Sequence, residues 1–113
     1  MKQKELTNFQ RRVYAMTSQI PRGKVTTYRD LGKAIGCRSP RAVGQALKRN
    51  PFAPKVPCHR VIAANGSLGG FHGEKEGVQI ARKRRMLTEE GVKFLKDGSI
   101  DLRCLWLPSC EAA

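Results

Sequence analysis

Residues 56–62 place a cysteine beside a histidine, as Cys58 and His59, between Pro57 and Arg60. A thiol near an imidazole can be an activated nucleophile, because a neighbouring base or cation raises the fraction of thiolate. Pro57 fixes the backbone before the thiol, and a polar Cys-His-Arg triplet has little reason to occur inside a core strand. The segment is therefore a candidate catalytic centre, and the alternative is an inert buried cysteine beside a structural histidine.

This segment is expected to form a short strand over residues 56–63. Adjacent side chains of a strand point to opposite faces, so Cys58 and His59 would not hydrogen-bond each other directly. Coupling would run through a bridging water, with a carboxylate holding the imidazole from behind. The basic groups of the chain and nearby helix N-termini are expected to favour thiolate over a free-thiol pKa of about 8.5.

The charge balance of the chain points to a polyanionic partner. The 113 residues carry 22 Lys and Arg against 9 Asp and Glu, which gives a formal net charge of +13. Such an excess on a small protein is typical of nucleic-acid binding, although a merely soluble basic protein would show it too. The length predicts a single domain over residues 1–113, with its core at about residues 8–107.

The apolar residues and the cysteines bear on where the protein works. No apolar run could cross a bilayer, and the first residues lack the apolar stretch of a secretory signal. We expect an intracellular monomer that does not enter a membrane, in the cytoplasm of a prokaryote or the nucleus of a eukaryote. The cysteines are therefore expected as free thiols: Cys37, Cys58, Cys104 and Cys110. They form no CxxC pair, so no metal site is expected.

Helix-starting residues predict two short helices in the middle of the chain. Thr27 and Asp30 have the spacing of a capping box, which would open a helix that runs through Ile35. Ser39 is the expected N-cap of a second helix over residues 41–49. A helix pair with basic groups on its second member is typical of a helix-turn-helix DNA-binding motif. The same pair also occurs as plain packing in helical domains.

The remaining elements surround this pair. A first helix is expected over residues 7–19, with one apolar stripe formed by Phe9, Val13, Met16 and Ile20. Residues 51–73 are expected to be mostly loop, and residues 77–89 a basic helix. A turn at residues 96–98 suggests a β-hairpin. The predicted fold is mainly α with small β elements, a single domain like a winged helix-turn-helix.

Several segments in order match one protein family. Residues 57–61 read Pro-Cys-His-Arg-Val, and further landmarks stand at residues 20–28, 41–47, 49–51 and 89–91. With these segments, nearly the whole chain resembles the O6-alkylguanine–DNA alkyltransferases, also called methylated-DNA–protein-cysteine methyltransferases, a family that includes the alkyltransferase-like proteins.

The resemblance implies direct reversal of DNA damage. An O6-alkylguanine would be rotated out of duplex DNA, and its alkyl group would pass irreversibly to Cys58. The implied partner is double-stranded DNA that contains O6-alkylguanine, and no cofactor is implied. A thioether is a very poor leaving group towards water, so each molecule would act once.

The resemblance also implies roles for single residues. His59 would act on the Cys58 thiol through water, and Glu90 would orient the imidazole. Tyr28 would crowd the DNA backbone during nucleotide rotation and assist protonation of the leaving base, which suits a neutral phenol. Arg41 is similar to the finger that fills the space of the extruded base, because a guanidinium can stack and hydrogen-bond there.

Further residues would contact DNA or line the pocket. The DNA contacts implied beside Tyr28 and Arg41 are Ala42, Gly44, Gln45 and Arg60. The implied pocket residues are Asn50, Val61, Phe71 and His72. Asn50 resembles the asparagine that ties the recognition helix to the active-site loop. His72 stands where the family usually has serine, so the shape of the pocket would differ.

Three other functions remain open. An alkyltransferase-like protein would flag the lesion without accepting the alkyl group; the short chain and His72 suit it, whereas Cys58 does not, because such proteins typically replace that cysteine. A winged-helix transcription regulator would need no Pro-Cys-His-Arg and would prefer particular undamaged sites. A cysteine hydrolase has little support, because His72 is the only histidine besides His59.

Overall fold

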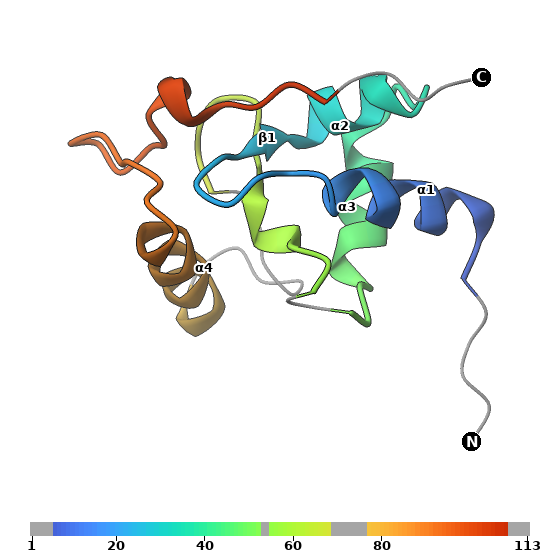
Figure 1. Cartoon of the computed structure of the whole chain (residues 1–113), viewed down its shortest axis with the longest axis horizontal. Helices are drawn as coiled ribbons and strands as arrows, with labels where there is room; N and C mark the ends of the chain where they lie inside the picture. The colour runs from blue at the N-terminus through green and yellow to red at the C-terminus, as the bar shows by residue number, and fades with distance from the viewer. Residues whose placement is uncertain (1–5, 53–54, 69–76, 109–113) are drawn as a thin grey trace.

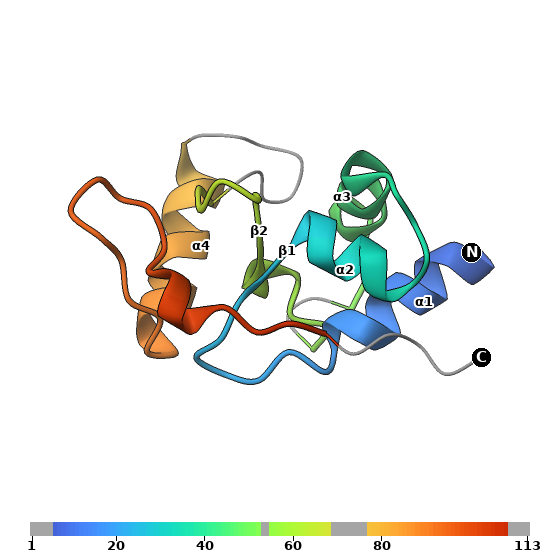
Figure 2. The same cartoon turned by 90° about the horizontal axis from the view of Figure 1, so that it is seen from above.

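Helices dominate the structure, a computed structural model that describes residues 6–52, 55–68 and 77–108. The elements in this part are α1 (Asn8–Thr17), β1 (Thr26–Thr27), α2 (Tyr28–Ala34), α3 (Pro40–Lys48), the 3-10 turn η1 (Cys58–Arg60), β2 (Val61–Ile62), α4 (Val78–Glu89) and the 3-10 turn η2 (Leu102–Cys104). The first three helices lie together on one side of the paired strands, and α4 lies on the other side (Figures 1 and 2). The predicted fold class, mainly α with small β elements, is confirmed.

The helix pair α2–α3 begins and ends as its sequence predicts. The Thr27 hydroxyl accepts a hydrogen bond from the Asp30 backbone N–H at 3.0 Å, and the Ser39 hydroxyl accepts one from the Ala42 N–H at 3.1 Å. Gly36 follows α2 with φ of +76°, a left-handed conformation that glycine adopts without strain. The two helices pack directly against each other, as a helix-turn-helix requires.

The core has two parts on either side of the strands. The stripe of α1 buries Val13, Met16 and Ile20 against α2 and α3, with Phe9 packed at its edge. The helix itself ends at Thr17, slightly earlier than predicted. The second part lies between β2, α4 and the C-terminal segment, and its buried members include Val25, Ile62, Leu87, Val92 and Ile100.

Short pairings join distant parts of the chain. β1 runs parallel to β2, with Thr26 opposite Val61, and Val25 bridges to Leu105 of the C-terminal segment. The predicted hairpin is present in minimal form, as an antiparallel bridge between Phe94 and Ile100. The β elements therefore act as ties between helices and not as a layer of their own.

The predicted strand over residues 56–63 is wrong in its first part. Cys58–Arg60 form a 3-10 turn, and only Val61–Ile62 pair as a strand. The backbone bonds are local: the Cys58 N–H donates to the Val56 carbonyl at 2.8 Å, and the Arg60 N–H donates to the Pro57 carbonyl at 2.9 Å. Because Pro57 has no N–H for a ladder, the chain turns here before it pairs.

Two helical glycines offer a matched test of the packing of α2 against α3. A Cβ on Gly32 would lie 2.7 Å from the Cys37 carbonyl oxygen, whereas a Cβ on Gly44 would meet no heavy atom within 4 Å. We expect Gly32→Ala to destabilise the protein by about 1–3 kcal/mol through overpacking, and Gly44→Ala to stabilise it by up to about 1 kcal/mol through helix propensity. Urea unfolding of both variants measures this, and equal effects would contradict the packing described.

Candidate active site

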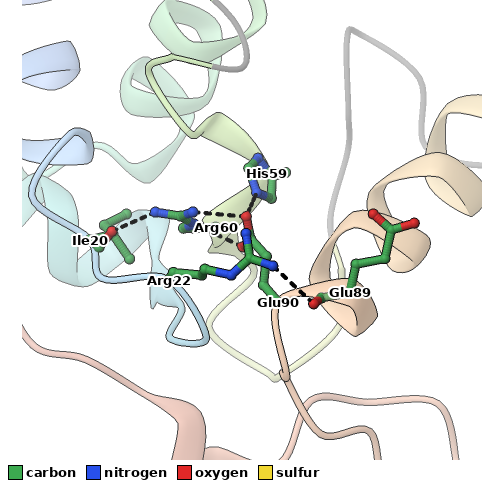
Figure 3. A network of polar contacts seen from close by, with 6 residues as sticks. All are labelled: Ile20, Arg22, His59, Arg60, Glu89 and Glu90. Carbon is green, nitrogen blue, oxygen red and sulfur yellow. Dashed lines mark hydrogen bonds and ion pairs between the residues drawn. The ribbon is translucent and has the colours of Figure 1, made fainter.

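The carboxylate of Glu90 organises the polar network beside the 3-10 turn. Glu90 caps the C-terminus of α4, and Arg60 grips its carboxylate through Nε–Oε1 at 2.9 Å and Nη2–Oε2 at 2.8 Å. His59 Nε2 lies 3.0 Å from Glu90 Oε2. Arg60 Nη1 donates to the Ile20 carbonyl at 2.8 Å, so one guanidinium joins the turn, α4 and the loop after α1 (Figure 3).

These contacts fix the charge states of the pair His59–Glu90. Burial would raise the pKa of Glu90, but hydrogen bonds from Arg60 and His59 lower it to about 2. Burial lowers the pKa of His59 and outweighs the opposing effect of Glu90. At neutral pH the carboxylate is therefore ionised and the imidazole neutral. The network then assigns the imidazole proton to Nε2, which donates to Glu90, and leaves Nδ1 as an acceptor.

Cys58 differs from the expectation of a resting thiolate. Its side chain is buried, and burial raises the pKa of the thiol, although a hydrogen bond from Asn50 and the charge of Lys83 act to lower it. Desolvation disfavours the charged form, and here it exceeds all the effects that lower the pKa. Within the described residues, no hydrogen bond joins the Cys58 thiol directly to His59. The resting site thus holds a neutral thiol near a neutral imidazole.

Asn50 connects the end of α3 to the segment that leads into Cys58. Its Nδ2 donates to the Val56 carbonyl at 2.9 Å, and its Oδ1 accepts from the Phe52 backbone N–H at 2.9 Å. The bond to Phe52 is the turn that an asparagine commonly forms at the end of a helix, whereas the bond to Val56 reaches the segment before Cys58. The structure therefore brings Asn50 to the position between helix and active-site segment that the resemblance implies.

Tyr28 lies at the start of α2, directly after β1, and is half-buried. Burial, followed by the charge of Cys58, raises the pKa of Tyr28 to about 12, so the phenol stays neutral and can donate a hydrogen bond. The ammonium of Lys83 lies 5.9 Å from the centre of its ring. Tyr28, Cys58 and Lys83 thus share one buried environment.

Lys83 is the site residue that the sequence did not reveal. It has no exposed surface, and its Nζ donates to the carbonyls of Val61 at 2.8 Å and Leu68 at 2.5 Å. Burial lowers the pKa of Lys83 to about 7. In the sequence it stands within a basic run, yet it shares the helical spacing of the apolar residues Ile80 and Leu87. That spacing places Lys83 on the inward face of the helix, and it was the one sign in the sequence that this lysine is buried.

The residues expected to contact DNA fall into two groups: those on α3 lie at an accessible face, and Arg60 is bonded within the protein. On α3, Arg41 and Gln45 are exposed, and Ala42 and Gly44 are half-buried, so this face is open to a partner. Arg60 is different, because its donors are used by Glu90 and the Ile20 carbonyl. The arrangement makes Arg60 a positioning residue for Glu90.

Of the predicted pocket residues, Val61 is fully buried in β2. Phe71 and His72 lie outside the described residues, as does Cys110. The other cysteines, Cys37, Cys58 and Cys104, are free thiols. In the described part of the chain, His, Cys, Asp and Glu side chains form no group of three or more that could hold a metal ion, and no helix has the length and apolarity to span a membrane.

Comparison with known sequences identifies related proteins. The sequence profile of the 6-O-methylguanine DNA methyltransferase, DNA binding domain, matches residues 8–92. The methylated-DNA–protein-cysteine methyltransferase of Methanothermobacter thermautotrophicus is 46% identical over 88 residues, which are 78% of this chain and 47% of that protein. The enzyme of the same name from Metallosphaera sedula is 46% identical over 84 residues, 74% of this chain and 49% of the relative. The chain spans about half the length of these relatives.

Solved structures show the same fold. Mycobacterium tuberculosis OGT in complex with DNA has a TM-score of 0.68 and 42% identity, covering 77% of this chain and 52% of that one. S. pombe Atl1 in complex with damaged DNA containing O6-carboxymethylguanine has a TM-score of 0.73 and 31% identity, covering 93% of this chain and 100% of that one.

The buried amine of Lys83 gives a test by pH. Folding lowers its pKa from 10.5 to about 7, so between these values the unfolded chain binds more protons and stability rises with pH. We expect the free energy of unfolding to rise by on the order of 1 kcal/mol from about pH 7 to about pH 8.5, and Lys83→Met to lose this rise. Urea unfolding at both pH values measures it, with exposed Lys93→Met as control. If the free energy of unfolding of Lys83→Met rose with pH as much as that of the native protein, the lowered pKa of Lys83 would be refuted.

Proposed function

The chain belongs to the family of the 6-O-methylguanine DNA methyltransferase DNA-binding domain, and from this premise we propose that it transfers the alkyl group of O6-alkylguanine in duplex DNA to Cys58. The observation that carries the proposal is the buried thiol of Cys58, next in sequence to His59, whose neutral imidazole an ionised carboxylate holds in place. A sequence regulator needs no such site. The curated relatives carry the name of this reaction.

The reaction starts with a proton transfer that the charge states allow. His59 takes the proton of the Cys58 thiol at Nδ1, through a bridging water, and Glu90 stabilises the imidazolium that results. The sulfur then attacks the alkyl carbon, a carbon–sulfur bond forms, and the bond between that carbon and guanine O6 breaks. Tyr28 donates a hydrogen bond to the departing purine, whose negative charge is neutralised by the proton that left the thiol.

The product explains why one molecule would act once. The alkylated cysteine is a thioether, and water does not displace a thiolate from a thioether at neutral pH. The neutral resting thiol is compatible with such use, because it acquires nucleophilic character only when His59 accepts its proton. The protein would then be consumed in proportion to the lesions removed.

DNA binding is assigned to the exposed face of α3. Arg41 and Gln45 project from a helix whose Gly44 leaves open space around it, so a sugar-phosphate backbone can approach closely. Rotating a nucleotide out of the duplex costs a few kcal/mol, which groove contacts and the filling of the vacated space offset. In this assignment Arg41 fills that space. The net charge of +13 supports binding that is strong, independent of sequence and sensitive to salt.

A second candidate is binding of the lesion without transfer. The likeness to Atl1, solved in complex with damaged DNA, supports it, with a TM-score of 0.73 and 31% identity. The presence of Cys58 favours transfer, since a protein that only binds the lesion needs no thiol to accept the alkyl group.

Intact-protein mass spectrometry separates the two candidates. After incubation with an excess of duplex that contains O6-methylguanine, we expect a mass gain of one methyl group, mapped to Cys58 by peptide analysis. Cys58→Ser should gain nothing, and Cys37→Ser should react like the native protein. A native thiol that stays unmodified while the duplex is bound would exclude transfer in favour of the second candidate.

The role of Arg41 is tested by comparing two substrates. Arg41→Ala should slow transfer from O6-methylguanine in duplex DNA by about tenfold or more, equivalent to about 1.4 kcal/mol. The reason is that no side chain then fills the space that the extruded base leaves in the stack. Transfer from the free O6-methylguanine base should change little, since no stack is opened. Arg11→Ala removes an exposed arginine from α1 and serves as control. Equal losses of rate on both substrates would show that Arg41 does not fill the space of the extruded base.

A further inference from the structure

Helix α4 carries a basic surface that the proposed reaction does not use. Its Lys83 and Leu87 are fully buried, whereas Arg82, Arg84 and Arg85 are exposed. Within the described residues, no carboxylate forms an ion pair with any of these three arginines. In the described part of the chain their charge is therefore unpaired, and it faces solvent.

This surface faces away from the helix-turn-helix. Lys83 points inward, since its Nζ donates to the Val61 carbonyl of β2. The paired strands separate α4 from α3 in both views (Figures 1 and 2). The side of α4 opposite Lys83 thus looks outward, away from α3, and its arginines form a basic face separate from that of Arg41.

Neighbouring segments hold some of these side chains in place. The Arg84 guanidinium stacks over the Phe94 ring at 4.7 Å from its centre, and its Nη2 lies 3.5 Å from the Gly98 carbonyl oxygen. At the other end of the helix, Arg22 Nη2 donates to the Glu89 carbonyl at 3.2 Å, which places a fourth guanidinium beside α4 (Figure 3). Ordered guanidiniums lose less entropy when they bind an anion.

Among the residues that the structure describes, two carboxylates stand near this surface. Glu89 is exposed at the last turn of α4, and Asp97 lies in the hairpin turn, where its Oδ1 accepts hydrogen bonds from Ser99. Neither is paired with an arginine of the surface in the described part of the chain. The face of α4 defined by Arg82, Arg84 and Arg85 therefore complements a repeating polyanion.

We propose that this α4 face binds the sugar-phosphate backbone of a second DNA duplex while α3 holds the duplex with the lesion. The inference rests on the proposed DNA binding by α3. DNA is stiff, with a persistence length of about 50 nm, and bending a site of 20–30 base pairs by 40–90° costs about 1–6 kcal/mol. A duplex on α3 does not wrap around so small a protein, so the phosphates that reach α4 belong to another segment.

Contacts of this kind are made to phosphate oxygens by guanidiniums, which bind them bidentately. They carry no base information, and they weaken with salt as counterions are released. The second duplex is therefore expected to bind without regard to sequence or damage. The protein would bridge two DNA segments during its search for lesions.

A two-duplex capture experiment tests the proposal. Protein is loaded at about 0.15 M salt on an immobilised duplex that contains O6-methylguanine, excess protein is washed away, and a fluorescent undamaged duplex is added. We expect the native protein to capture the second duplex and Arg82→Gln/Arg85→Gln to capture at least about fivefold less. The double variant should bind the first duplex and transfer the methyl group as the native protein does.

The matched control is Arg11→Gln/Lys24→Gln, which removes the same charge from exposed positions outside both basic faces and should capture like the native protein. Equal capture by both double variants, or no capture by native protein that holds the first duplex, overturns the proposal. Capture of vesicles rich in anionic lipid, with no capture of DNA, would overturn it in favour of a membrane partner. Failure of the native protein to hold the first duplex would count against the proposed function itself.

Discussion

The carboxylate of Glu90 is the group on which the arrangement of the site depends. It receives two hydrogen bonds from Arg60 and one from His59, and through Arg60 it is joined to the Ile20 carbonyl. Three segments far apart in the sequence therefore meet at one charge. A buried carboxylate left without such donors would take up a proton, and the imidazole would then lose the acceptor that determines which of its nitrogens carries hydrogen. The same carboxylate therefore both orients the imidazole of His59 and holds the end of α4 against the 3-10 turn.

Burial, more than the excess of cations, sets the electrostatic character of the centre. The chain has a net charge of +13, yet the pKa of Cys58 is raised, because removal of the thiol from water outweighs the nearby charge of Lys83. The cations that make the protein basic act mostly at its surface, where water screens them. A thiol kept neutral until substrate arrives also reacts slowly with other electrophiles. For a protein proposed to act once, that protection has a direct use.

The helices could be predicted because their capping residues lie close together in the sequence, whereas the contacts of Arg60 and Lys83 with distant residues could not. The caps at Thr27 and Ser39 define α2 and α3 from the sequence alone, and the resemblance named Glu90 and His59, which lie in contact in the structure. The strand predicted before Val61 failed because Pro57 favours a turn whose bonds span only a few residues. The hydrogen-bond partners of Arg60 and Lys83 lie many residues away in the sequence, so the sequence does not reveal them. Arg60 was predicted to contact DNA and Lys83 was given no role, yet both donate to acceptors inside the protein.

The inward position of Lys83 limits how the gene for this protein can vary. An α-helix turns by about 100° for each residue, and Lys83 reaches the Val61 carbonyl only at its present phase relative to Leu87. Point mutations on the outer side of α4 leave that phase untouched, so the packing of the helix places no demand on which exposed residues stand there. A single codon gained or lost between those for Lys83 and Leu87 would rotate an exposed side chain into the interior. Lineages of this protein should therefore agree in the spacing of these inward residues, whichever residues stand on the outer side of the helix.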